Sequence, residues 1–247
     1  MDLGLAGKSV LITGGSKGIG FACAKAFVAE GSRVHLAARD RAGLEQARSR
    51  LQGEVVLHAV DLREPSALRE LAAACAHVDI LVNNAGDIPG GTLDSIDEET
   101  WRRAWELKVF AYINLSRELF GRMKARRAGV IVNIIGMAAE KPSFEYICGA
   151  TANAGLAAFS KALGKAYGEH GVRVVGVHPP STRTDRILKV MKAAAKAKLG
   201  DENRYPDLIA SGAFGGMIEP EQVGDTVAFL ASARAGQLSG VVLNLGS

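Results

Sequence analysis

The sequence predicts an α/β protein built on one parallel sheet with helices on both faces. The first observation is an alternation along the whole chain between short, β-branched apolar runs and longer segments whose apolar residues recur at helical spacing. The second is the composition. The 247 residues are 48% hydrophobic and 23% charged, as in an ordinary globular protein whose core needs no disulfides. Strands that alternate with helices are joined by right-handed crossovers, which makes them parallel. We therefore expect a single domain over residues 1–247.

Each strand is predicted from a short apolar run, and about seven are expected: Ser9 to Ile12, Arg33 to Ala37, Val55 to Val60, Val78 to Val82, Val130 to Ile135, Val172 to Val177 and Val241 to Leu245. Each helix is predicted from apolar residues at helical spacing: Ile19 to Glu30, Leu44 to Leu51, Ala67 to Ala76, Glu98 to Lys124, Ile147 to Glu169 and Val223 to Ser232. The acidic residues 97–99 suit a helix start, because negative charge stabilises a helix N-terminus. Residues 186–218 fit this alternation least well. They are either a substrate lid over the carboxyl ends of the strands or a surface excursion.

Charge and cysteine content exclude several classes of protein. The net charge is only +4, from 30 basic and 26 acidic residues, and no basic run indicates a nucleic-acid-binding face. Cys23, Cys75 and Cys148 are widely spaced and form no Cys-x-x-Cys pair, which is typical of a reducing compartment and argues against a metal site. We find no signal peptide and no apolar run near the ~18 residues of a membrane span. We therefore expect a cytoplasmic protein that binds neither nucleic acid nor membrane nor metal.

A glycine-rich segment lies between the first predicted strand and the first predicted helix. Glycine lets the backbone turn tightly and approach a pyrophosphate, and the helix that follows offers unpaired N–H groups and the positive end of its dipole. The strand–turn–helix context strengthens a motif that would be weak alone. The residues expected to bind the cofactor here are Gly14, Ser16, Lys17, Gly18, Ile19 and Gly20.

Three motifs in sequence order carry a resemblance to a known family. The chain resembles the short-chain dehydrogenase/reductase family in these motifs: Thr-Gly-x-x-x-Gly-Ile-Gly from Thr13, Asp61-Leu62 after the third strand, and Asn83-Asn84-Ala85-Gly86 after the fourth. The resemblance implies a Rossmann-type, doubly wound sheet, a nicotinamide cofactor, a small-molecule substrate, and a homodimer or homotetramer formed through the two long helices. It also implies the roles of further cofactor-binding residues: Asp61 and Leu62 at the adenine end, Asn83, Ala85 and Gly86 along the groove, and Pro179 and Thr184 beside the nicotinamide carboxamide.

The end of the second strand indicates which cofactor is preferred. NAD enzymes of this kind carry a carboxylate there for the ribose 2′-OH. Here the position is Ala38, followed by Arg39, whose planar guanidinium suits a 2′-phosphate, and Lys17 adds a second cation. We therefore expect NADP(H) to be preferred over NAD(H). An inward-turned Asp40 would weaken that preference.

The catalytic residues that the resemblance implies are absent from their expected positions. The family works with a Ser, a Tyr-x-x-x-Lys pair and an Asn. Aligned by motif, the Ser becomes Gly136, the Tyr becomes Gly149, the Lys becomes Asn153 and the Asn becomes Lys108. The lysine and the asparagine are thus exchanged between two positions that face each other across the family's active site.

Tyr146 is a candidate catalytic residue, and its position favours an enzyme. It lies three residues before Gly149, nearly one helical turn back on the same face, and Gly149 leaves room for its ring. The Tyr-x6-Asn spacing to Asn153 resembles the Tyr-x6-Lys spacing of enoyl-ACP reductases in this superfamily. We expect Tyr146, Lys108 and Asn153 to be the catalytic residues. A packing role for Tyr146 and a surface position for Lys108 stay open.

The leading hypothesis is an NADP(H)-dependent oxidoreductase that transfers hydride between the nicotinamide and a carbonyl or alcohol carbon, with Tyr146 as the proton donor or acceptor. One alternative is a nucleotide-binding protein without redox turnover, which the four replaced residues favour. A lyase or isomerase that uses Tyr146 on the same fold is the third hypothesis.

Overall fold

A seven-stranded parallel sheet forms the centre of the molecule in this computed structural model, which describes residues 2–209 and 216–246. The strand order is β3-β2-β1-β4-β5-β6-β7, and every pairing is parallel. The chain reverses its direction of winding between β1 and β4, so the carboxyl ends of these two strands mark the switch point of the sheet. The strands are β1 Ser9–Thr13, β2 Arg33–Ala38, β3 Val55–Ala59, β4 Ile80–Asn83, β5 Gly129–Ile134, β6 Val172–His178 and β7 Val241–Asn244.

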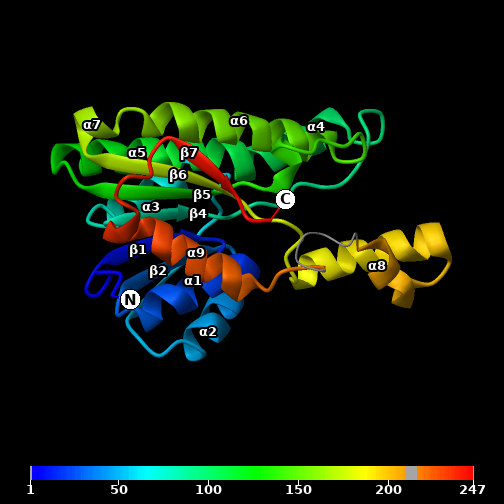
Figure 1. The fold of residues 1–247 in the computed structure, drawn as a ribbon, viewed down its shortest axis with the longest axis horizontal. Coiled ribbons are helices and arrows are strands. Elements are labelled where there is room, and N and C mark those ends of the chain that lie inside the picture. The colour runs from blue at the N-terminus through cyan, green and yellow to red at the C-terminus, as the bar shows by residue number, and fades with distance from the viewer. Residues whose placement is uncertain (1, 210–215, 247) are drawn as a thin grey trace.

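Helices cover both faces of the sheet, as the sequence predicts (Figure 1). α1, α2 and α9 pack on one face, whereas α3, α5 and α6 pack on the other. The helices are α1 Gly18–Ala29, α2 Arg41–Ser49, α3 Pro65–Ala74, α4 Glu98–Trp105, α5 Ala111–Ala125, α6 Ile147–Gly164, α7 Tyr167–His170, α8 Asp185–Leu199 and α9 Pro220–Ala231.

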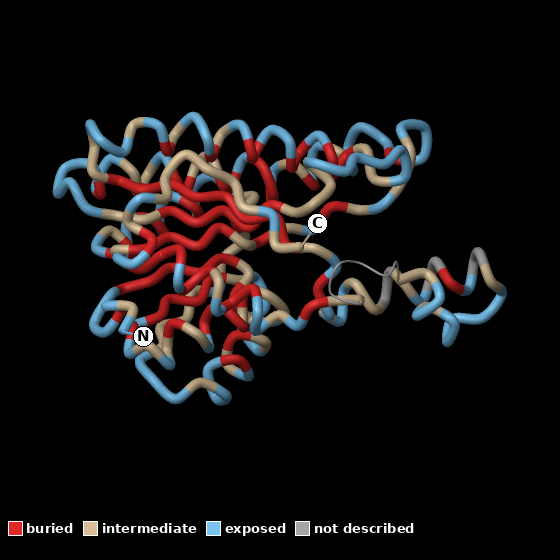
Figure 2. The backbone as a smooth tube through the Cα atoms, viewed as in Figure 1, coloured by how far each residue is buried: buried red, intermediate tan, exposed pale blue. Residues whose placement is uncertain are grey.

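The core is divided by the pleat of the sheet. Val10 and Ile12 of β1 contribute to the cluster under α1 and α9, while Leu11 between them contributes to the cluster under α3 and α5. Successive side chains of a strand point to opposite faces, so a sheet covered on both sides needs apolar residues throughout. The central strands are accordingly buried along their length (Figure 2).

Two long helices differ from the prediction. The segment expected as one helix from Glu98 to Lys124 contains a π-helical turn, η1, at Glu106–Phe110 between α4 and α5. A π turn inserts one residue into the helical repeat, and such turns are frequent at functional sites. The helix expected to run from Ile147 to Glu169 ends at Gly164, and the short α7 follows it.

An arm made of α8 and the 3₁₀ helix η3, Glu202–Leu208, stands away from the body of the molecule (Figure 1). Within the arm, the Lys192 ammonium lies 6.0 Å from the centre of the Tyr205 ring. The arm corresponds in sequence to most of the segment 186–218, which the sequence predicted to depart from the strand–helix alternation. Residues 210–215 of that segment lie outside the described residues. Among the helices of the described chain, none is long and apolar enough to cross a membrane.

Candidate active site

The loops after β1 and β4 are tied together at the switch point. The Thr13 hydroxyl accepts hydrogen bonds from the backbone N–H groups of Asn84, at 2.9 Å, and Ala85, at 3.1 Å. The Asn84 side-chain amide donates to the carbonyl oxygens of Thr13, at 2.9 Å, and Gly14, at 3.2 Å. These hydrogen bonds therefore join two loops that are far apart in the sequence into one surface at the carboxyl edge of the sheet.

The glycine-rich loop leaves the start of α1 open for an anion. Gly14 and Gly18 have φ values of 66° and 56°, in the left-handed region that favours glycine. A Cβ on Gly20 would lie 2.3 Å from the Gly14 carbonyl oxygen, so only glycine allows α1 to begin this close to the loop. Lys17 is the exposed N-cap of α1, and no side chain of the described residues caps this helix. The N–H groups of its first turn therefore remain for a phosphate.

Arg39 and Asp40, which follow β2, differ in their surroundings. The Arg39 side chain is exposed. The Asp40 carboxylate is the N-cap of α2, where its Oδ1 accepts a hydrogen bond from the Ala42 N–H at 3.1 Å. Asp40 is therefore held by the helix that follows it.

At the end of β3, Arg63 binds the Asp61 carboxylate, with its Nε 3.0 Å from Oδ1 and 3.1 Å from Oδ2. This pairing with Arg63 lowers the pKa of Asp61. Leu62 buries its side chain in the core cluster below α3 and α5. Sequence reasoning missed Arg63, which is only two residues from Asp61.

Asn83 braces the interior of the sheet. Its side chain is 1% exposed and donates to Asn133 Oδ1 at 2.9 Å and to the Ser116 hydroxyl at 3.1 Å. Asn133 in turn donates to the Ser160 hydroxyl at 2.8 Å. This polar chain joins β4, β5, α5 and α6 below the site. Any contact between Asn83 and a cofactor in the groove must therefore use its backbone.

Lys108 is buried, and its ammonium is held at the end of β5. The side chain is 8% exposed and leaves the π turn η1. Nζ donates to the carbonyl oxygens of Ile134, at 2.8 Å, and Ile135, at 3.1 Å, and lies 3.3 Å from the Tyr112 hydroxyl. Burial lowers the pKa of Lys108 to about 7, and the nearby charge of Arg186 acts in the same direction. The surface position that the sequence left open for Lys108 is therefore wrong.

Asn153 lies against the backbone position where the family has its serine. Gly136 has a φ of 133°, and a Cβ there would lie 2.9 Å from the Asn153 amide nitrogen. That nitrogen is 3.5 Å from the Gly136 carbonyl oxygen. Lys108 and Asn153 thus reach consecutive peptide groups, Ile135 and Gly136, from two different helices. Lys108 and Asn153 therefore both meet the end of β5.

The Tyr146 ring fills the space that Gly149 leaves empty. A Cβ on Gly149 would lie 2.1 Å from Cε1 and 2.2 Å from Cζ of this ring. Tyr146 is the N-cap of α6 and lies outside its helical residues, so the sequence-based placement inside one helical face needs that correction. The edge of the ring that carries the hydroxyl still lies directly over Gly149. Burial raises the pKa of Tyr146, while the nearby positive charge of Arg186 acts in the opposite direction.

Arg186, in the first turn of α8, also contacts this end of the sheet. Its guanidinium donates to the carbonyl oxygens of Gly86, at 3.2 Å, and Ile88, at 2.6 Å, and lies 3.8 Å from Asp87 Oδ1. Thr184, two residues earlier, caps α8 and faces Gly18 of the glycine-rich loop. Pro179 is buried where β6 ends. The segment after β6 therefore reaches both the glycine-rich loop and the loop after β4.

Comparison with known proteins identifies the family. The family model described as short chain dehydrogenase matches residues 8–194. The chain belongs to the short-chain dehydrogenase family. It is 31% identical over 250 residues to an oxidoreductase of Bacillus subtilis strain 168, YvrD, covering 97% of this chain and 95% of the relative.

Two solved structures of oxidoreductases share the fold of this short-chain dehydrogenase. L-sorbose reductase from Gluconobacter frateurii, complexed with NADPH and L-sorbose, has a TM-score of 0.91 and 30% identity over 99% of this chain and 97% of that one. A 7α-hydroxysteroid dehydrogenase complexed with NADH and 7-oxo glycochenodeoxycholic acid has a TM-score of 0.88 and 26% identity over 99% and 94% of the two chains. The predicted Rossmann-type fold is thus confirmed.

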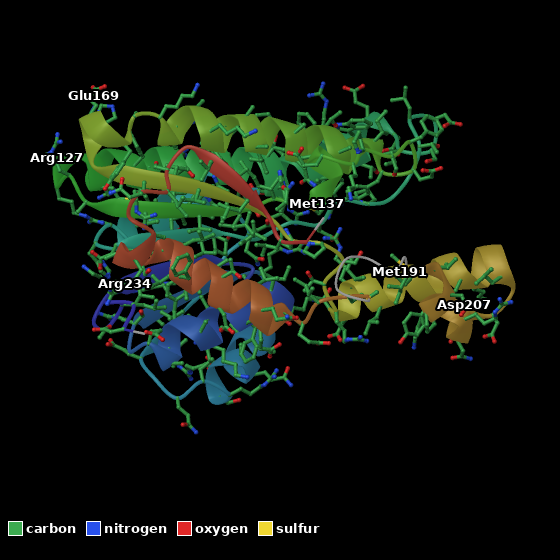
Figure 3. The ribbon with its side chains drawn as sticks, viewed as in Figure 1. Arg127, Met137, Glu169, Met191, Asp207 and Arg234 are labelled. Atoms are coloured by element: carbon green, nitrogen blue, oxygen red, sulfur yellow. The ribbon has the colours of Figure 1, made fainter. Side chains whose placement is uncertain are left out.

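The candidate site of this short-chain dehydrogenase lies at one end of the sheet. Figure 3 shows Met137, next to Gly136, at the end of the sheet that faces the arm, whereas Arg127 and Glu169 lie at the opposite end. The glycine-rich loop, the segment after β4, Tyr146, Lys108 and Asn153 all belong to the end near Met137. Sequence reasoning missed Arg186, although a cation two residues after the motif residue Thr184 was a usable signal.

Proposed function

We propose that this protein is an NADP(H)-dependent oxidoreductase that transfers hydride between the nicotinamide and a carbonyl or alcohol carbon. The observation that carries the proposal is the position of the Tyr146 ring over Gly149. The phenol therefore occupies the space of a side chain at the position where the family pattern has its tyrosine. The cofactor supplies the hydride chemistry when it is bound, and the protein supplies orientation and protons.

The pKa of each group suits its proposed task. Burial keeps the Tyr146 phenol protonated at neutral pH, so it donates a proton to the oxygen of a carbonyl that is being reduced. Arg186 makes the loss of that proton easier because its charge stabilises the phenolate. Lys108, with a pKa of about 7, exchanges protons near neutral pH and adds positive charge below the site. Asn153 positions the Gly136 peptide.

Replacing Tyr146 by phenylalanine tests the proposal. NADPH consumption is measured with a panel of aldehydes and ketones, and Tyr146→Phe should reduce kcat by about 10²–10⁴-fold, the usual contribution of a general acid. Tyr167→Phe, which changes a phenol on α7 at the far end of the molecule, is the matched control and should keep full activity. Consumption that is unchanged in Tyr146→Phe would refute the role of this residue.

A second candidate function is nucleotide binding without turnover, and the replacement of all four family residues favours it. In that case NADPH binds with ordinary affinity, the whole panel gives no consumption, and Tyr146→Phe changes nothing. A lyase or isomerase would instead convert its substrate without net oxidation of NADPH.

The preference for NADP(H) rests on Ala38 and Arg39 at the end of β2, with Lys17 as a second cation. Arg39 is free to contact a 2′-phosphate, and Asp40 is held as the cap of α2. L-sorbose reductase, a relative of similar fold, is described with NADPH. Arg39→Ala should weaken NADPH binding by at least about 10-fold and leave NADH binding nearly unchanged, because a guanidinium–phosphate contact is lost. Tighter NADH than NADPH binding by the wild-type protein would overturn the preference.

The arm and the long helices carry two further proposals. We propose that α8 and η3, which stand away from the body in this structure, form a substrate lid with Arg186 as its anchor at the start of α8. The prediction of a homodimer or homotetramer also stands as a proposal. Tyr112 and Leu119 belong to the core, and Phe110 is 43% exposed on the long helical segment. Light scattering on the eluted protein tests the oligomeric state, and a monomer would contradict it.

A further inference from the structure

Three side chains with metal-binding atoms meet beneath α3, outside the candidate active site. His35 lies on β2 and His58 on β3, while Cys75 is the C-cap of α3. β2 and β3 are neighbours in the sheet, with His35 opposite Val56 and Ala37 opposite His58. The two histidines are therefore diagonal neighbours on one face, because residues two apart on a strand share a face. That face is the one that α3 covers.

The three ligand atoms have the separations of a metal site. His35 Nδ1 is 3.0 Å from His58 Nε2, and Cys75 Sγ is 3.7 Å from His35 Nδ1 and 3.6 Å from His58 Nε2. Tetrahedral Zn²⁺, with bonds of about 2.0–2.1 Å to nitrogen and about 2.3 Å to sulfur, separates two nitrogens by about 3.3 Å and nitrogen from sulfur by about 3.6 Å. The observed separations differ from these by a few tenths of an ångström at most.

The environment also suits a metal. Cys75 is fully buried and His35 is 3% exposed, so the site is closed toward the core, while the half-buried His58 leaves a route to solvent. The same cluster can also be explained as a hydrogen bond between two neutral imidazoles beside a thiol. A metal ion would join all three atoms through bonds to one centre.

We propose that His35, His58 and Cys75 form a binding site for Zn²⁺, with water as the fourth ligand. Binding replaces the proton of the Cys75 thiol by the metal, and that proton passes to the solvent. The bound ion would tie β2, β3 and α3 together at the edge of the sheet. The proposal revises the expectation of no metal, which rested on sequence spacing alone. It is independent of the proposed reductase activity.

Cobalt substitution tests the site on the full-length protein after chelator treatment. One equivalent of Co²⁺ per chain should produce a thiolate-to-cobalt charge-transfer band, and Zn²⁺ should abolish that band. Cys75→Ala should lose the band. Cys23→Ala removes another buried cysteine and should keep it. Thermal unfolding provides an independent readout, since Zn²⁺ at 100 times its Kd should raise Tm by roughly 5–10 °C in the wild-type protein and not in Cys75→Ala.

His58→Ala is a second variant that tests the site even if Cys75→Ala fails to fold. His58 is only half-buried, so its replacement should disturb the fold less. Its metal affinity should fall by at least about 100-fold while the protein remains folded. No stoichiometric metal binding by the wild-type protein, or a thiolate band that persists in Cys75→Ala, would overturn the proposal.

Discussion

Replacing Gly149 by alanine should displace the Tyr146 ring and remove most of the activity. The added methyl carbon would lie 2.1 Å from Cε1 and 2.2 Å from Cζ, whereas ordinary contacts begin near 3.4 Å. The ring must therefore move by more than about 1 Å, and a displacement of that size costs about 10²-fold in rate. Overpacking of a buried contact should also lower the free energy of unfolding by about 1–3 kcal/mol.

Gly155→Ala provides the matched control for this experiment. Gly155 lies on the same helix, α6, with open space around its missing Cβ. Alanine there should preserve kcat and stabilise the helix by about 0.5–1 kcal/mol. The assay is steady-state NADPH oxidation with the best carbonyl of the panel, alongside urea unfolding of each variant. A Gly149→Ala protein that keeps wild-type kcat would refute the proposal that the ring must lie there.

Three further predictions concern single groups around the site. The pKa of Lys108 is lowered from 10.5 to about 7 on folding, so between these pH values the unfolded chain binds more protons and stability rises with pH. The difference in free energy of unfolding between the wild-type protein and Lys108→Met, measured by urea unfolding, should therefore increase by up to about 1.4 kcal/mol per pH unit in that window. A difference that does not change with pH would contradict the burial of this ammonium. Asn133→Ala removes one hydrogen-bond partner from each of the buried Asn83 and Ser160 side chains and should cost about 2 kcal/mol or more in urea unfolding; a loss below about 0.5 kcal/mol would show that the buried polar chain does not brace the sheet. Asp40→Ala should cost about 1 kcal/mol of stability through the lost cap of α2, while the ratio of NADPH to NADH dissociation constants stays the same; a large change in that ratio would place Asp40 at the ribose.

Local spacing was enough to predict the parts of the site that depend on one stretch of chain. The glycine-rich loop follows a strand and begins a helix, so its geometry follows from short-range rules. The space at Gly149 for Tyr146 was predicted in the same way, because the two residues are three apart. The π turn was not predictable, since one inserted residue hardly changes the apolar periodicity of the long helix, although it is this turn that carries Lys108.

Contacts between distant segments were beyond the reach of the sequence alone. Arg186 meets the loop after β4 across about 100 residues of chain, because both segments reach the carboxyl edge of the sheet. His35, His58 and Cys75 are brought together by the pairing of β2 with β3 and by the packing of α3, and no motif spacing marks them. In both cases the tertiary fold sets the neighbours.

The distance between the Tyr146 hydroxyl and the reactive end of the nicotinamide tests the central claim most directly. It is measured in a crystal structure of the protein with NADPH and a carbonyl inhibitor. The account predicts the hydroxyl within hydrogen-bond reach, about 2.6–3.2 Å, of the inhibitor oxygen beside the nicotinamide. A phenol that points away from the nicotinamide pocket, with another group on that oxygen, would contradict it.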